Sequence, residues 1–145
     1  MKRLLFVLSS ALLLSACAPR ELIKDEIALD RYKEANAAFV KEQYQECIPH
    51  YEYVIQWRDR IFDAYVKLGI CYEQVGRGEE SVTILKTLLR VDPTNIEGMR
   101  TLAHVYERSN DQQSAIDLQQ KLLDRNPGDK QAWNDLQRLR GESGE

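Results

Sequence analysis

Apolar residues follow two different patterns along this chain. Near the N-terminus they form one stretch over positions 4–14, broken only by Ser9 and Ser10. From residue 28 onward they recur every three to four positions, the spacing that places side chains on one face of an α-helix. The stripe is clearest in three segments: Ile48, Tyr51, Val54 and Ile55; Val82, Leu85, Leu88 and Leu89; and Ile116, Leu118, Leu122 and Leu123. This pattern predicts an all-α protein.

The helical pattern repeats itself with a period of 34 residues. Val91-Asp92-Pro93 and Arg125-Asn126-Pro127 are separated by this distance. The same separation holds for four further pairs: Leu68-Gly69 and Leu102-Ala103, Tyr72 and Tyr106, Ser81 and Ala115, and Leu88 and Leu122. A fixed period of this length indicates two-helix units that cannot bury their apolar stripes alone and must stack on their neighbours.

The repeating unit resembles the tetratricopeptide repeat (TPR), in which a large residue, a Leu-Gly pair and a Tyr mark the first helix, and Ala and Pro mark the second. Residues 62–95 and 96–129 carry this pattern. Residues 28–61 carry a weaker copy, in which Arg31 and Glu34 replace large apolar residues and Asp59 replaces the terminal proline. The resemblance implies an α-solenoid of three helix-turn-helix repeats, followed by a capping helix at 130–140 and a frayed tail at 141–145.

Turn and cap residues lie where the repeats predict helix ends. Four residues that tolerate unusual backbone angles fall at predicted turns: Gly76, Gly78, Asn110 and Asp111. Asn95 and Asp129 each follow an Asp-Pro or Asn-Pro turn and are predicted helix N-caps. Pro49 lies inside the second helix of the first copy. Because it cannot bond to the Gln45 carbonyl, it predicts a kink that costs about 3 kcal/mol.

The N-terminal segment has the zones of a signal peptide. Two basic residues at positions 2 and 3 precede the apolar stretch, which is shorter than the roughly 20 residues of a membrane-spanning helix. Leu14-Ser15-Ala16-Cys17 resembles the lipobox of bacterial lipoproteins. The resemblance implies removal of residues 1–16, a covalent diacylglycerol and N-acyl chain on Cys17, and a short tether over 17–27. The alternative is a secretory signal with a cysteine near its end.

The residue after the cysteine indicates a location within the cell envelope. Ala18 stands where the inner-membrane retention signal of Gram-negative lipoproteins usually has Asp. By this resemblance we expect the periplasmic face of the outer membrane, or the outer face of the cell in an organism with a single membrane.

Charge and composition limit the possible chemistry. The formal net charge is −3 without a basic patch, which argues against nucleic-acid binding. His50 and His104 lack the partner spacing of a metal or catalytic site, so we expect no metal, no enzyme activity and no cofactor beyond the lipid. Cys47 and Cys71 occupy small-residue positions of the helix packing, where a thiol acts as a small hydrophobe. A disulfide between them is the alternative in an oxidising compartment.

The resemblance places a partner-binding groove at five positions of each first helix. In this chain these residues grade from apolar to charged: Leu29, Tyr32, Asn36, Phe39 and Val40; then Asp63, Val66, Ile70, Glu73 and Gln74; then Glu97, Arg100, His104, Glu107 and Arg108. Six apolar side chains on an open face would form a hydrophobic anchor site for a protein or peptide. Alternatively, residues 18–27 or a second copy of the chain cover this patch.

Two comparisons within the resemblance shape the expected function. Co-chaperone TPR domains grip a C-terminal carboxylate with Lys and Asn residues, and here only Asn36 matches while Tyr32 replaces a Lys. Small TPR lipoproteins of Gram-negative envelopes are the better comparison. We therefore expect a membrane-anchored adaptor in envelope assembly, secretion or pilus biogenesis. A self-associating lipoprotein is the alternative, and an envelope enzyme would need catalytic residues that this sequence does not display.

Overall fold

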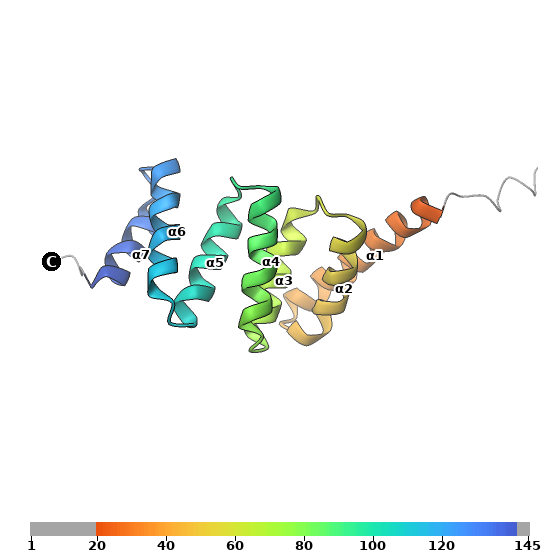
Figure 1. Ribbon diagram of the computed structural model, residues 1–145. Helices are drawn as coiled ribbons and strands as arrows, with labels where there is room; N and C mark the ends of the chain where they lie inside the picture. The colour runs from red at the N-terminus through yellow and green to blue at the C-terminus, as the bar shows by residue number, and fades with distance from the viewer. Residues whose placement is uncertain (1–19, 142–145) are drawn as a thin grey trace, which may run out of the picture.

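The computed structural model describes residues 20–141, and in this part of the chain helices are joined by short turns (Figure 1). These residues form seven helices: α1 (Arg20–Val40), α2 (Tyr44–Trp57), α3 (Phe62–Gln74), α4 (Gly78–Val91), α5 (Ile96–Arg108), α6 (Gln112–Arg125) and α7 (Lys130–Arg140). The predicted helical class is confirmed. The predicted signal peptide, the lipidated Cys17 and the tail residues 142–145 lie outside the described residues.

The helices form two layers because each repeat contributes one helix to each layer. The first helices α1, α3 and α5 continue into α7, while α2, α4 and α6 form the other layer; Figure 1 shows α4 in front of α3. Within residues 20–141, the backbones of α1 and α3, and of α3 and α5, approach one another, whereas those of the second helices do not. The first-helix layer is therefore the shorter, inner side of a curved stack.

Small residues are required where the two helices of a repeat cross. A Cβ atom on Gly69 of α3 would lie 2.8 Å from Cγ of Leu85 on α4, too close for two carbon atoms. The hydroxyl of Ser81 donates a hydrogen bond of 2.7 Å to the Gly69 carbonyl across the same crossing. Leu85, Leu88 and Leu122 are fully buried beside these crossings. The apolar stripes predicted from the sequence therefore form the core.

The turn inside each repeat uses the same left-handed backbone position with three different residues. Gly76 has φ of +80°, Asn110 has +63° and Glu42 has +59°. Glycine adopts this conformation freely, and asparagine adopts it at a small cost. Glutamate has no such advantage, so the first repeat carries local strain of about 1 kcal/mol at Glu42. The predicted turns at Gly76 and Asn110 are confirmed.

Among helices α2 to α7, only the last three begin with a residue whose side chain caps the helix. Asn95 caps α5 through Gly98 N, Asp111 caps α6 through Ser114 N, and Asp129 caps α7 through Ala132 N. The N-cap residues of α2, α3 and α4 make no side-chain hydrogen bond to their helices. The predicted caps at Asn95 and Asp129 are confirmed.

The first helix begins earlier than predicted. Residues 17–27 were expected to form a short tether, but α1 already starts at Arg20. The ammonium of Lys24 lies 3.6 Å from the centre of the Trp57 ring, and Asp25 lies 3.3 Å from the Arg58 guanidinium. These contacts with the end of α2 give the additional turns a partner, which explains why the helix extends beyond the repeat.

Two further expectations concern the first repeat. Helix α2 runs without interruption from Tyr44 to Trp57 although it contains Pro49, and the kink at this residue stays a prediction. Pro49 is exposed, and the pyrrolidine ring therefore displaces no core side chain. Cys47 and Cys71 form a disulfide that joins α2 to α3, so they are more than small packing residues.

Helix α7 closes the stack as the predicted cap. Ala132, Leu136 and Leu139 are buried against the preceding repeat. Gln137 and Arg140 stand at the repeat positions that hold small residues and tyrosines in α3 and α5, where a following second helix would pack. These polar residues solvate the outer side of the cap. Within residues 20–141, no helix combines the length and hydropathy needed to cross a membrane.

Candidate docking face

The inner face is the surface formed by α1, α3, α5 and α7, and side chains connect each of these helices to the next. Four of the connections join residues 31 positions apart: Tyr32 to Asp63, Asn36 to Lys67, Glu73 to His104, and Glu107 to Arg138. This offset is three residues shorter than the 34-residue period, so at each junction a residue meets the one that stands three positions earlier in the next repeat unit. The inner face therefore has a defined register from one end of the stack to the other.

At the N-terminal end of the inner face, polar groups are held against aromatic rings. The hydroxyl of Tyr32 donates a hydrogen bond to Asp63. The side-chain oxygen of Asn36 accepts hydrogen bonds from Tyr51 at 2.9 Å and from Lys67 at 2.7 Å. The same lysine lies 2.8 Å from Asp63. Every member is paired, so this cluster acts as a stable polar junction between repeats 1 and 2.

Burial keeps the tyrosines of this region neutral. It raises the pKa of Tyr51 well above the usual 10.0, and Asp63 adds to the shift. Burial and then the hydrogen bond to Asp63 raise the pKa of Tyr32. Burial and the hydrogen bond to Glu52 raise the pKa of Tyr72 to about 12. Each hydroxyl therefore stays a donor to its acceptor throughout the physiological range.

A buried carboxylate connects α3 to α5 in the middle of the inner face. The Glu73 side chain is only 7% exposed, and its Oε1 lies 2.8 Å from Nε of Arg108 and 3.6 Å from Nδ1 of His104. The Arg108 contact is an ion pair with poor hydrogen-bond alignment. The side chains of His104 and Arg108 are 60% and 57% exposed. Their outer surfaces are therefore open to a partner, although Glu73 holds their inner sides.

Ion pairs attach α7 to α5 at the C-terminal end. Arg100 pairs with Asp129, which also caps α7. Arg138 binds both carboxylate oxygens of Glu107, the second at 3.0 Å. This hydrogen-bonded pair lowers the pKa of Glu107 and raises the pKa of Arg138. The capping helix is therefore part of the inner face, which extends beyond the three repeats.

The predicted groove residues do lie on the first helices, but they differ in accessibility. Leu29 and Val40 are exposed, as are His104 and Arg108. Tyr32, Asn36, Phe39, Ile70 and Arg100 are half-buried. Val66 is only 1% exposed and packs with Tyr65 and Leu88, so its assignment to an open groove is wrong.

The predicted hydrophobic anchor is accordingly smaller than expected. Phe39 packs edge-on against Tyr44 and Tyr51, at 5.9 and 6.4 Å between ring centres. Tyr32 packs against Tyr51 at 6.3 Å. These rings are partly used within repeat 1, because α1 contributes few large aliphatic side chains to the core. Leu29 and the edges of the rings remain available on the surface.

Two inner-face residues were not predicted. Lys67 lies one turn after Asp63 on α3, and the four-residue spacing of opposite charges was a signal for their pairing. Arg138 occupies the position in α7 that Asn36, Ile70 and His104 occupy in the three repeats. Continuing the period into the capping helix would have found it.

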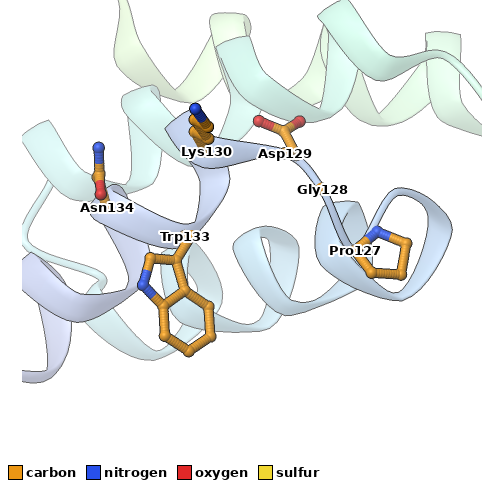
Figure 2. A pocket seen from close by; sticks show the side chains of 6 residues that line it. All are labelled: Pro127, Gly128, Asp129, Lys130, Trp133 and Asn134. Carbon is orange, nitrogen blue, oxygen red and sulfur yellow. The ribbon is translucent and has the colours of Figure 1, made fainter.

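A second surface feature is a hollow of about 300 Å³ at the turn between α6 and α7. Figure 2 shows the Trp133 indole and the Pro127 ring beside this turn, with Lys130 and Asn134 at the start of α7. Trp133 is 54% exposed. The hollow lies at a single turn, whereas the inner face runs along all four first-layer helices.

Among the residues that the structure describes, no three His, Cys, Asp or Glu side chains form a group that could hold a metal ion. The charged groups of the inner face neutralise one another across helix junctions. Such pairs fix the orientation of the side chains that they join.

Comparison with known protein families identifies one repeat of this chain from its sequence. Residues 62–95 match the tetratricopeptide repeat family model, with the boundaries expected for the second repeat. Over 108 residues the chain is 27% identical to human Superkiller complex protein 3 and 26% identical to the mouse protein. These matches cover 72% of this chain, which spans only 7% of the length of either relative.

Solved structures share the fold over 81% of this chain at low sequence identity. The Arabidopsis OM64 TPR domain has a TM-score of 0.74 at 16% identity, covering 81% of this chain and 98% of that domain. The second TPR domain of human RPAP3, solved with an HSP70 peptide, has a TM-score of 0.72 at 16% identity and the same coverages. MamA protein has a TM-score of 0.71 at 21% identity, covering 81% of this chain and 66% of that one.

The fold is therefore that of a TPR domain, and at least the second of its repeats is a tetratricopeptide repeat by sequence. Proteins built from this repeat are generally scaffolds that bind other proteins and carry no catalytic site. The stack of first helices that forms the inner face is the part of this chain that such a role would use.

Proposed function

We propose that this chain is a membrane-anchored adaptor that docks a protein or peptide partner on its inner face, in envelope assembly, secretion or pilus biogenesis. The main observation behind this proposal is the continuous inner face, on which Leu29, His104 and Arg108 are exposed. Neighbouring charged side chains are held in place by ion pairs between helices. Fixed side chains lose little freedom on binding, which favours recognition.

The solved relatives support the mode of binding without defining the partner. The second RPAP3 TPR domain was solved with the HSP70 peptide SGPTIEEVD, and the first TPR domain of Spaghetti with the HSP90 peptide SRMEEVD. A peptide is accordingly the simplest occupant for an inner face of this curvature. In this chain the oxygen of Asn36 is already occupied by Tyr51 and Lys67, so a different set of contacts is expected.

Two features support a location outside the cytoplasm. The sequence Leu14-Ser15-Ala16-Cys17 resembles a lipobox, and a diacylglycerol with an N-acyl chain on Cys17 would hold the chain at a membrane. The disulfide between Cys47 and Cys71 is typical of proteins that mature in an oxidising compartment. We place the protein at the cell envelope, on the periplasmic face of the outer membrane in a Gram-negative host.

The docking proposal is tested by cross-linking and capture from host envelopes with matched variants. Leu29→Glu and His104→Ala alter exposed inner-face side chains, and His104→Ala leaves the buried Glu73 paired with Arg108. Lys121→Glu, on the exposed side of α6, is the control. We expect capture of a defined partner to fall at least tenfold in the inner-face variants and to stay unchanged in the control. Equal capture by all three would refute docking on this face.

The anchor is tested separately by Cys17→Ser. We expect the wild-type chain to fractionate with membranes and to incorporate labelled palmitate, because acyl chains contribute about 0.8 kcal/mol per buried methylene. The variant should lose the label and leave the membrane fraction. A variant that remains with the membranes after a carbonate wash would overturn the lipid tether.

A further inference from the structure

The disulfide occupies a particular place in the stack. Cys47 lies on α2, the second helix of repeat 1, and Cys71 lies on α3, the first helix of repeat 2. Both side chains are completely buried, at 0% exposed. The bond therefore crosses the interface between the first repeat and the second, and holds repeat 1 against the stack.

The described part of α1 contributes little buried apolar area to repeat 1. Among the described side chains of α1, only Ala28 and Ala35 are fully buried, and alanine offers little apolar area. Pro49 removes a backbone hydrogen bond from α2, and Glu42 holds an unfavourable positive φ at the turn. Repeat 1 therefore depends more than repeats 2 and 3 on contacts with its neighbour.

We propose that oxidation of Cys47 and Cys71 is the step that assembles the inner face: with free thiols repeat 1 opens from the stack, while residues 62–140 remain folded. This inference rests on the proposed function, because the open form would lack the part of the docking face that Leu29, Tyr32 and Phe39 provide. The adaptor then binds its partner only after it has left a reducing compartment.

The step is a thiol–disulfide exchange. A disulfide of a thiol oxidoreductase or of a small molecule accepts two electrons and two protons and becomes two thiols. The Cys47 and Cys71 thiols supply these electrons and protons, and a bond forms between their Sγ atoms. Because both sulfurs are buried in the closed stack, exchange proceeds through the open form. The closed, oxidised form is therefore protected against reductants.

The later repeats supply a matched replacement for the cysteines. Ala115 occupies the position of Cys47 in repeat 3, and Val105 occupies the position of Cys71 in the same repeat. Both residues are buried there. The double variant Cys47→Ala/Cys71→Val therefore keeps residue types that this fold accepts and removes only the covalent bond.

The experiment measures hydrogen exchange of the full chain in detergent by mass spectrometry. Three samples are compared: the oxidised chain, the same chain reduced in denaturant and refolded in reductant, and the Ala/Val variant. We expect peptides from residues 28–57 to exchange roughly a hundredfold faster in the last two samples, as expected for loss of the bridge. Peptides from residues 96–140 should change less than twofold, and the variant should not respond to reductant.

Two results would overturn the inference. Acceleration of less than tenfold in residues 28–57 would show that repeat 1 is stable without the bond. Equal acceleration through α7 would show that the bond supports the whole stack. Neither hydrogen-exchange readout involves a partner, so this inference can fail independently of the docking proposal. Failure of the docking proposal would instead appear as an oxidised chain that captures no partner.

Discussion

Repeat 1 and repeat 3 have the same two-helix outline, but different interactions stabilise them. In repeat 3, α5 and α6 are capped by Asn95 and Asp111 and share a core rich in leucine. In repeat 1, the buried core contains alanine, tyrosine, cysteine, Ile48 and Val54 but no leucine, and α2 has no side-chain cap. The disulfide and the aromatic cluster compensate for the missing leucines and caps.

This difference teaches that the period of the sequence specifies the outline of a repeat without specifying its stability. Stacked repeats are stabilised by their internal contacts and by the interface with each neighbour. A repeat with a poor interior can persist if its interface is strong. Here the interface between repeats 1 and 2 includes a covalent bond and the paired groups of Tyr32, Asn36, Asp63 and Lys67.

The largest expected effect comes from truncating the core at one repeat position. Leu122→Ala in repeat 3 removes three carbons from a fully buried site and should lower the free energy of unfolding by about 3 kcal/mol. Val54→Ala, at the corresponding position of repeat 1, removes two carbons and should cost about 2 kcal/mol. Urea unfolding followed by circular dichroism measures both. A larger loss for Val54→Ala would reverse our comparison of the two interiors.

The two ends of the stack should also respond to opposite extremes of pH. The pKa of Tyr72 is raised from 10.0 to about 12, so its stabilising effect is complete below pH 10 and is lost as the pH rises through 12. The pKa of Glu107 is lowered from 4.5, so its contribution is complete above pH 4.5 and is lost as the pH falls through the lowered value. Alkali should therefore loosen the N-terminal end first, and acid the attachment of α7.

Fluorine NMR can separate these responses because each end contains one tryptophan. Trp57 reports on α2 and Trp133 on α7 after labelling with 5-fluorotryptophan. We expect the Trp57 resonance to move first between pH 9 and 12, and the Trp133 resonance to move first between pH 6 and 3. Simultaneous movement at both extremes would show that the stack unfolds as one unit.

The smallest expected effect is a gain in stability from copying a turn. Glu42→Asn with Gln43→Asp reproduces Asn110-Asp111 in the first repeat, where the backbone already has a positive φ at Glu42. Relief of strain and a new cap on α2 should together raise the free energy of unfolding by about 1 kcal/mol. Thermal unfolding measures the gain, and Lys121→Glu serves as a distant surface control. No gain would mean that the turn does not limit the first repeat.

Most of the fold could be predicted from the sequence because it depends on local periodicity. The period of 34 residues located the second-repeat helices, and Asn95, Asp129 and Gly76 marked ends and turns that the structure confirms. The early start of α1 could not be predicted in this way. It depends on the contact of Lys24, which precedes the first repeat, with Trp57 at the end of α2, a residue far from it in sequence.

The candidate site was predictable in position but not in accessibility. The resemblance to the tetratricopeptide repeat placed Tyr32 and His104 on the first-helix face, yet it could not show that Val66 is buried in the core. The groove assignment treated each helix alone, whereas burial depends on how the second helices cross it. Likewise, the spacing of Cys47 and Cys71 allowed either a disulfide or two packed thiols, and only the approach of α2 to α3 distinguishes them.

The most direct test of the account is site-specific photo-cross-linking of the full chain in the envelope of its host. A photoreactive residue at Leu29 or His104 probes the inner face on α1 and on α5, and one at Thr83 or Lys121 probes the exposed side of the second helices. We predict one shared cross-linked partner from both inner-face positions and none from the other two. Cross-links to that partner from Thr83 or Lys121, with none from Leu29 or His104, would contradict docking on the inner face.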